Sequence, residues 1–247
     1  FEFRGVSFSY AGSEKKVLDS IDFRFDAGER IALIGENGAG KTTLVKLLAR
    51  LYDPTEGAIL LDGVDLRDYN VADLRREIGV IFQDYMRYDM LARDNIGVGR
   101  IDEMDDLTRI ERAARKSLAE PLIATLPGGY DQMLGRRFDE GVDLSAGQWQ
   151  KIALARAYMR DAQVLILDEP TASLDARAEY EVFLRFTELT RDRMAVLISH
   201  RFSTVRMADR ILVLAGGIIQ EQGTHEQLRA LGGRYSELFE LQAAGYR

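Results

Sequence analysis

The sequence predicts an α/β fold with a mostly parallel sheet, an N-terminal group of antiparallel strands and an inserted helical part. Short runs of almost wholly apolar residues recur along the chain, as strands buried on both faces of a parallel sheet require. Helical patterns lie between these runs, and this alternation is typical of a parallel sheet covered by helices. The middle of the chain contains no convincing strand and is rich in charge and helix formers, which indicates the insertion.

Individual elements follow from the spacing of the apolar residues. From Phe1 to Phe25 apolar and polar residues alternate, which predicts antiparallel strands with one face in solvent. A turn at 27–29 then leads into Arg30–Ile34, a run suited to a buried parallel strand. Further buried strands are expected at Ile78–Phe82, Val164–Leu167, Met194–Ile198 and Ile211–Leu214, helices at 41–51, 149–159 and 235–241, and a hairpin at 216–219.

We expect one domain over residues 1–247. Its α/β core and antiparallel β subdomain take about residues 1–83 and 161–247, and its helical subdomain takes about residues 84–160. The chain begins with Phe1 rather than Met, so we expect it to be a piece of a longer protein whose preceding part could include membrane spans. Within the chain no apolar run approaches the roughly 18–20 residues needed to cross a bilayer.

Composition excludes several classes of function. The chain has 247 residues and no cysteine, which rules out a disulfide scaffold, a thiolate metal site and a Cys nucleophile. Its formal net charge is −7 at pH 7. Such a chain lacks the overall basic field of a phosphate-backbone binder, so no nucleic-acid partner is expected.

Residues 35–42 match the phosphate-loop pattern G-x-x-x-x-G-K-[ST], between a buried strand and an amphipathic helix. Glycines let backbone N–H groups approach phosphate oxygens, and the helix N-terminus adds its positive dipole. Lys41 would place its charge on the β- and γ-phosphates, while the Thr42 hydroxyl could ligate Mg²⁺. The alternative is a Gly-rich turn before a lysine, and such a chance match is on the order of one in a hundred. Nucleotide binding is therefore predicted.

Two carboxylates follow the apolar run Val164–Leu167. A parallel strand would deliver both at the carboxyl edge of the sheet, where ligands bind in open α/β folds. Asp168 then suits the Mg²⁺ shell, and Glu169 suits orienting or deprotonating an attacking water. The alternative is that the two acids merely end the strand in solvent. The presence of a phosphate loop favours the functional interpretation.

Residues 144–148 read Leu-Ser-Ala-Gly-Gln before the expected helix at 149–159. Ser145 could be a helix cap, since Ser is favoured there. With the phosphate loop and the two acids, however, this pentapeptide resembles the LSGGQ signature of the ATP-binding-cassette (ABC) ATPases, with Ala146 as a departure at the third position. The resemblance covers essentially the whole chain and implies the P-loop NTPase (RecA-like) fold.

The resemblance also implies roles at other positions. Tyr10 corresponds to the aromatic that stacks on adenine, the alternative being a strand aromatic packed in the sheet. Gln83 resembles the Q-loop glutamine, which joins the Mg²⁺ and water shell to the helical subdomain, and Asp175 resembles the D-loop residue that meets the opposite subunit. His200 resembles the switch histidine at the γ-phosphate. His225 lies in a polar segment and is expected at the surface.

The complete expected site then falls into three groups. The catalytic group is Glu169, His200, Lys41 and Gln83, and Mg²⁺ is held by Thr42, Gln83 and Asp168. ATP is bound in cis by Tyr10, Gly35, Asn37, Gly38, Gly40, Lys41, Thr42 and Thr43, and in trans by Ser145, Gly147, Gln148 and Asp175.

Three stretches, at 52–57, 74–79 and 198–205, look like the exporter branch of the family. That resemblance implies an ATP-hydrolysing nucleotide-binding domain that pairs head to tail with a second such domain, identical or different, around two ATP. It also implies a transmembrane domain, fused N-terminally, and a place on the cytoplasmic face of the cell (inner) membrane. Glu140 and Gly141 fall where exporters touch the coupling helices, whereas residues 84–88 depart from the family pattern in a region that faces the transmembrane partner.

Three alternatives remain open. The first is the separately encoded ATPase subunit of an ABC importer, which the gene sequence upstream of Phe1 would distinguish. The second is a soluble, non-transport ABC protein, although only one phosphate loop occurs here and no sustained heptads lie between Gln83 and Ser145. The third is a module that binds ATP without turnover, against which Lys41 and Glu169 count.

Overall fold

A computed structural model describes residues 1–82, 84–138, 140–168, 184–199 and 201–244. The chain folds as two compact units, which are described separately. The strand-rich unit comprises residues 1–80, 163–169 and 192–247, and the helical unit comprises residues 81–162 and 170–191. Within the described residues, no helix combines the length and the apolar character needed to cross a membrane.

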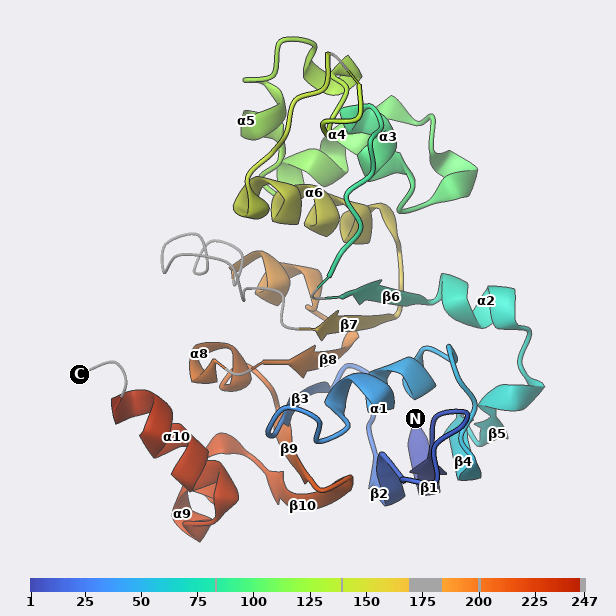
Figure 1. Ribbon diagram of the computed structural model, residues 1–247, viewed down its shortest axis with the longest axis vertical. Coiled ribbons are helices and arrows are strands. Elements are labelled where there is room, and N and C mark those ends of the chain that lie inside the picture. The colour runs from blue at the N-terminus through green and yellow to red at the C-terminus, as the bar shows by residue number, and fades with distance from the viewer. Residues whose placement is uncertain (83, 139, 169–183, 200, 245–247) are drawn as a thin grey trace. The chain divides into compact units, whose positions relative to one another are not determined.

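The strand-rich unit contains two sheets (Figure 1). A four-stranded sheet has the order β2-β1-β4-β5, and its pairs are antiparallel. A six-stranded sheet has the order β10-β9-β3-β8-β7-β6. The strands are β1 (Glu2–Phe8), β2 (Leu18–Arg24), β3 (Arg30–Ile34), β4 (Glu56–Leu61), β5 (Val64–Asp65), β6 (Ile78–Ile81), β7 (Val164–Asp168), β8 (Met194–Ile198), β9 (Arg210–Ala215) and β10 (Ile218–Gly223).

Strand β3 lies inside the six-stranded sheet and pairs in parallel with β8 and β9. Strand β7 pairs in parallel with β8, in a register that sets Asp168 opposite Ile198. The edge strand β10 pairs antiparallel with β9 and forms the hairpin expected near Gly216. Because β3, β8 and β7 all run the same way, their carboxyl ends meet at one edge of the sheet.

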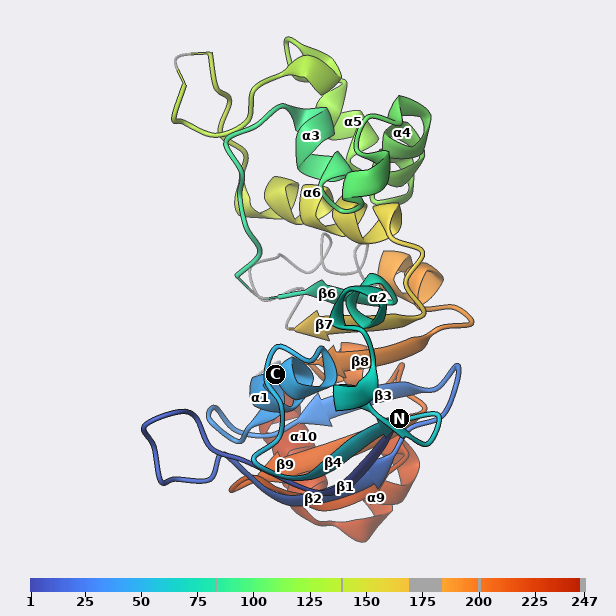
Figure 2. The same cartoon turned by 90° about the vertical axis from the view of Figure 1, so that its right-hand side faces the viewer.

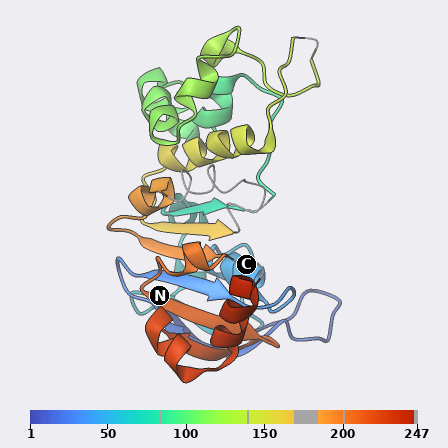
Figure 3. The ribbon, with the colours of Figure 1, turned by 90° about the vertical axis from the view of Figure 1, so that its left-hand side faces the viewer.

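The inner strands β3, β7, β8 and β9 are buried on both faces of the six-stranded sheet, and alternate residues of each strand pack on opposite sides. On one face Ile31 and Leu33 of β3 pack with α1 (Lys41–Leu48) and with the four-stranded sheet. On the other face Ala32 and Ile34 pack in a second cluster that includes Tyr235. Figure 3 shows α9 (His225–Leu231) and α10 (Arg234–Ala244) on this second side, and Figure 2 shows α1 on the first.

The helical unit is built around α6 (Ala146–Met159). Its buried Trp149 packs with residues of α3 (Ala92–Gly97) and α4 (Leu107–Lys116) in one apolar cluster. A short helix, α5 (Glu120–Ile123), completes this cluster, and residues 184–189 are also helical. The described residues of this unit contain little β-structure. It consists of the isolated bridges Leu91–Met133 and Leu134–Val142 and of the last residue of β6.

The segment at 84–88 is held by a partly buried arginine. The Arg156 guanidinium donates to the Met86 carbonyl at 2.5 Å and lies 4.8 Å from the centre of the Tyr88 ring. It also donates to the backbone and side-chain oxygens of Asn95, at 2.6 and 2.7 Å. Burial lowers the pKa of Arg156 to about 10, so the side chain stays charged at neutral pH.

The predicted fold class is confirmed, and the structure adds elements that the sequence pattern did not predict. These are the strands β4 and β5 and the helices α2 (Val71–Arg76), α8 (Phe202–Val205) and α9. Strand β6 ends at Ile81 rather than at Phe82. The described residues 184–191 belong to the helical unit, whereas the sequence analysis assigned them to the core, and the exact domain bounds stay a prediction.

Candidate nucleotide-binding site

The phosphate loop joins β3, which ends at Ile34, to α1, which begins at Lys41. Gly35 has φ +149°, and a Cβ there would lie 2.1 Å from the Leu214 carbonyl oxygen. Gly40 has φ +105°, and a Cβ there would lie 2.6 Å from a methyl carbon of Leu18. Both ends of the loop therefore need glycine, because any side chain would be strained and would collide with its surroundings.

Lys41 turns back over the loop that precedes it. Its ammonium donates to the carbonyl oxygens of Gly35 and Glu36, at 2.8 and 3.0 Å. Only 7% of the residue is exposed. These bonds hold the positive charge over the concave backbone, where it can meet a phosphate oxygen.

The first turn of α1 also forms part of the candidate phosphate site. Gly40 occupies the N-cap position and brings no side chain that could cap the first N–H groups. The first turn of α1 also carries no acidic residue. The N–H groups at the start of the helix and the helix dipole therefore favour an anion at the loop. Asn37 and Gly38 lie in the same loop, as expected, and Gly38 has φ +80°.

Thr42 and Asp168 meet at the carboxyl edge of the sheet. The Thr42 hydroxyl donates to an Asp168 carboxylate oxygen at 3.2 Å. Asp168 ends β7 and is only 5% exposed. Hydroxyl and carboxylate oxygens are the hard ligands that Mg²⁺ prefers, and Mg²⁺ held together with nucleotide phosphates needs only one or two carboxylates. In the described part of the chain no group of three or more His, Asp or Glu side chains could hold a metal.

Tyr10 follows β1 and packs against two other aromatic rings. Its ring lies 4.9 Å from the Phe8 ring and 5.5 Å from the Tyr52 ring, and both pairs are edge-to-face. Its hydroxyl lies 3.0 Å from the Thr43 hydroxyl in α1. The aromatic expected to stack on adenine is thus tied to the phosphate-loop helix through Thr43, whose role toward ATP stays a prediction.

Ser145, Gly147 and Gln148 lie at the start of α6 in the helical unit. The Ser145 hydroxyl accepts from the Gln148 N–H at 3.3 Å, and the Gln148 side-chain oxygen accepts from the Ser145 N–H at 2.8 Å. This reciprocal pair is a capping box. The alternative interpretation of Ser145 as a helix cap is therefore correct for the isolated chain, and its role toward a second subunit stays a prediction.

Four predicted site residues lie outside the described residues. They are Gln83, Glu169, Asp175 and His200. The structure brings together Tyr10, Thr43, Lys41, Thr42 and Asp168 in the strand-rich unit, through the contacts given above.

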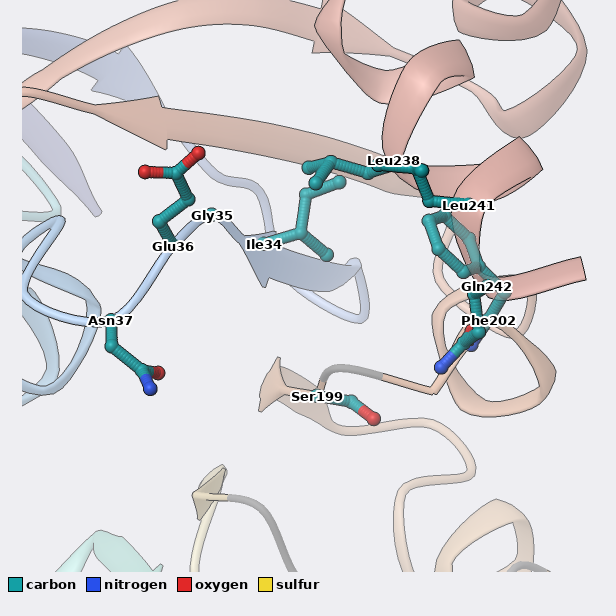
Figure 4. A pocket seen from close by; sticks show the side chains of 9 residues that line it. All are labelled: Ile34, Gly35, Glu36, Asn37, Ser199, Phe202, Leu238, Leu241 and Gln242. Atoms are coloured by element: carbon teal, nitrogen blue, oxygen red, sulfur yellow. The ribbon is translucent and has the colours of Figure 1, made fainter. Parts of the chain in front are cut away.

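The structure also brings together side chains that the sequence analysis did not select. Arg234 of α10 forms an ion pair with Glu36 of the phosphate loop. The Gln242 side-chain oxygen accepts from the Phe202 N–H at 3.0 Å. Both contacts border a pocket of about 460 Å³, and Figure 4 shows loop, β8-end and α10 side chains around it. Its lining residues are Ile34, Gly35, Glu36, Asn37, Ser199, Phe202, Leu238, Leu241 and Gln242.

The expectation that His225 lies at the surface holds only in part. His225 is half-buried at the start of α9, and its Nδ1 lies 2.6 Å from the Tyr235 hydroxyl. Burial and the nearby Arg206 lower the pKa of His225. A polar sequence context gave no sign of this contact, because Tyr235 belongs to the next helix.

Comparisons with known proteins agree with this geometry. The family described as "ABC transporter" matches residues 18–172, which is more than half of the chain. Similar proteins are the subtilin transport ATP-binding protein SpaT of Bacillus subtilis, 42% identical over 92% of this chain and 37% of the relative, and the ATP-dependent lipid A-core flippase of Salmonella paratyphi A, 41% identical over 98% of this chain and 41% of the relative.

A solved structure described as a bacterial Atm1-family ABC exporter with ATP bound is similar, with a TM-score of 0.89 and 36% identity. The match covers 98% of this chain and 41% of that chain. The chain thus spans about two fifths of the length of the proteins it matches. It belongs to the ABC transporter family.

Proposed function

We propose that this domain binds ATP with Mg²⁺ and uses its hydrolysis to drive export through a transmembrane domain on the cytoplasmic side of a cell membrane. The observation that carries the proposal is the meeting of Lys41, Thr42 and Asp168 at one edge of the sheet. The names of the similar proteins, a lipid A-core flippase and a subtilin transport ATP-binding protein, support the link to export. Their greater length supports a further domain in the whole protein.

The residues divide the work of hydrolysis. Lys41 and the N–H groups at the start of α1 would bind and orient the phosphates. Thr42 and Asp168 would hold Mg²⁺, with Gln83, and this ion would neutralise charge that develops on the β- and γ-phosphate oxygens. Glu169 would accept the proton of the attacking water, and His200 would donate to the γ-phosphate. Tyr10 would stack on the base.

The partner in this proposal is a second ABC ATPase domain, identical or different. Ser145 and Gly147 stand at the N-terminus of α6, where a hydroxyl, N–H groups and the helix dipole suit a γ-phosphate. An anion bound by both surfaces favours the closed pair, and hydrolysis removes that anion. The transmembrane domain would be fused N-terminally and would couple closure of the pair to movement of cargo.

Calorimetry and phosphate release test the site. The purified chain should bind MgATP, and Lys41→Ala should reduce that affinity by at least about tenfold, because a charge-assisted contact with phosphate is lost. Lys46→Ala provides the matched control, since Lys46 lies in the last turn of the same helix. If the chain has no affinity for MgATP, or Lys41→Ala leaves that affinity unchanged, the proposal fails.

The export half of the proposal is tested separately. The sequence upstream of Phe1 should contain about six apolar spans of about 20 residues each. The whole protein, reconstituted in lipid vesicles, should hydrolyse ATP and lose that activity with Lys41→Ala. An upstream sequence without such spans would favour a separately encoded subunit.

A further inference from the structure

The hydroxyl of Tyr10 reaches the helix that follows the phosphate loop. It lies 3.0 Å from the hydroxyl of Thr43, which is 33 residues away along the chain. Thr43 is only 6% exposed, so its side chain is held in place by packing. A hydrogen bond to a fixed hydroxyl restricts how far the phenol ring can swing sideways from its position.

Two neighbouring rings restrict Tyr10 further. The Phe8 ring is inclined at 84° to the Tyr10 ring, and the Tyr52 ring at 89°. Phe8 also contacts Tyr52, with ring centres 5.5 Å apart, so the three rings form a closed cluster. Phe8 is buried, whereas Tyr52 is 44% exposed. Tyr52 therefore lies on the solvent side of the ring cluster, and Phe8 anchors the cluster in the core.

We propose that Thr43 and Tyr52 are positioning residues that hold the Tyr10 ring for a nucleobase, so that affinity for the base depends on both. This inference rests on the proposed function, in which Tyr10 stacks on the base. Stacking on an aromatic side chain contributes roughly 5- to 150-fold to affinity per base. That contribution requires a ring already in place, because a mobile ring loses conformational freedom when the ligand binds.

The link also connects two parts of the ligand. Thr43 belongs to the helix whose N-terminus would face the phosphates, and Tyr10 belongs to the segment after β1. A change at the Thr43 hydroxyl should therefore be felt at the base, although Thr43 itself is next to the phosphate loop. A ligand with a base and a ligand without one separate these two effects.

The experiment is a double-mutant cycle read with MgATP and with magnesium tripolyphosphate, by calorimetry. Tyr10→Phe keeps the ring and removes the hydroxyl, and it should weaken MgATP binding about 2- to 10-fold. The same change should leave tripolyphosphate binding unaltered. In a Thr43→Val background, Tyr10→Phe should have no further effect on MgATP, because the hydrogen bond is already absent.

Tyr52 is tested with a conservative and a disruptive change. Tyr52→Leu should weaken MgATP binding and leave tripolyphosphate binding unchanged. Tyr52→Phe keeps the ring, and it should therefore keep the MgATP affinity of the unaltered chain. Tyr69→Phe is the control, because the Tyr69 hydroxyl donates to the Leu61 carbonyl in the same unit, at 2.9 Å and outside the ring cluster. This change should leave binding of both ligands unaltered.

Three results would overturn the inference. One is an equal loss from Tyr10→Phe with and without the Thr43 hydroxyl, and another is no loss in either background. The third is an equal loss for tripolyphosphate, which would indicate general damage to the phosphate loop. Failure of the proposed function would look different, since the unaltered chain would then not bind MgATP at all.

Discussion

The Thr42 hydroxyl lies 3.2 Å from the Asp168 carboxylate, although 126 residues separate them along the chain. Strand order explains the contact. Strand β3 leads to the phosphate loop, β7 ends in Asp168, and β8 lies between them with parallel pairing on both sides. Parallel strands end at the same edge, so two groups that are both suited to Mg²⁺ arrive at one place.

Asp168→Asn tests this pair. The amide keeps the shape of the side chain and removes the negative charge, so the affinity for ATP in the presence of Mg²⁺ should fall at least about tenfold. In EDTA the affinity for ATP should stay the same or rise, because a negative charge near the phosphates is gone. Titration calorimetry with and without Mg²⁺ measures both.

Asp209→Asn is the matched control for that measurement. Asp209 pairs with Arg30 at the start of β3, away from its carboxyl end. This variant should keep the ratio of ATP affinities with and without Mg²⁺. A loss for Asp168→Asn of the same size in EDTA would remove Asp168 from the proposed metal site.

Glu169→Gln separates binding from turnover. If Glu169 accepts the proton of the attacking water, the amide should slow phosphate release at least about 100-fold. ATP binding should persist, and the ATP-bound pair of domains should accumulate on size-exclusion chromatography. Glu14→Gln, at an exposed position, is the control and should hydrolyse ATP normally. Near-normal phosphate release by Glu169→Gln would reject the assigned role.

The buried strands and the phosphate loop could be predicted because their signals are local. Strand β7 is buried along its whole length, so its apolar run is visible in the sequence itself. The loop glycines, Lys41 and Thr42 are contiguous, and their geometry follows from the strand and helix on either side. In each case the neighbouring residues carry the information.

The missed elements have weaker or overlooked local signals. Strand β4 buries only Ile59 and is held by pairing with β1, which the sequence of β4 alone does not encode. Helix α2 is six residues long and buries only Leu74. Helix α9 had a usable signal, because Thr224 and Gln227 form a capping box with the T-x-x-Q spacing.

Contacts between distant side chains were beyond sequence reasoning. Glu36 pairs with Arg234, and the Tyr10 hydroxyl contacts the Thr43 hydroxyl. Both contacts form only because the folded sheets bring these distant segments together. The types and the spacing of residues do not show which side chain of a distant helix will contact which side chain of the loop. Such contacts define the surroundings of the site, whereas the motif defines its centre.

Gly35→Ala should be more damaging than an alanine at a less crowded glycine. Its Cβ would overlap the Leu214 carbonyl, in addition to the strain of a positive φ, so the free energy of unfolding should fall by at least about 2 kcal/mol. Gly28→Ala is the control, because Gly28 has φ +76° and no atom within 4 Å of the added carbon. It should cost about 1 kcal/mol.

Urea unfolding of both variants measures this difference, and calorimetry with MgATP should show weaker binding for Gly35→Ala alone. Equal destabilisation would mean that the backbone near Leu214 yields to the new carbon. In that case the close approach seen at Gly35 would not restrict the loop.

His225 predicts a pH dependence of stability. Burial and the positive charges of Arg206 and Arg229 lower its pKa below the ordinary value of 6.5, while Glu226 acts in the opposite direction. Burial also raises the pKa of Tyr235 to about 12, so its phenol stays neutral and bonded to the imidazole. The unfolded chain therefore binds a proton at His225 before the folded chain does, as the pH falls.

The sign follows from that order of protonation. Above about pH 6.5 the His225 contribution is fully present, and it is lost as the pH falls from 6.5 toward the lower pKa of the folded state. The free energy of unfolding, measured with urea at several pH values, should therefore decline less steeply below pH 6.5 for His225→Gln than for the unaltered chain. Tyr235→Phe keeps the titrating ring and should keep the steeper decline. Parallel curves for His225→Gln and the unaltered chain would show that His225 titrates alike in both states.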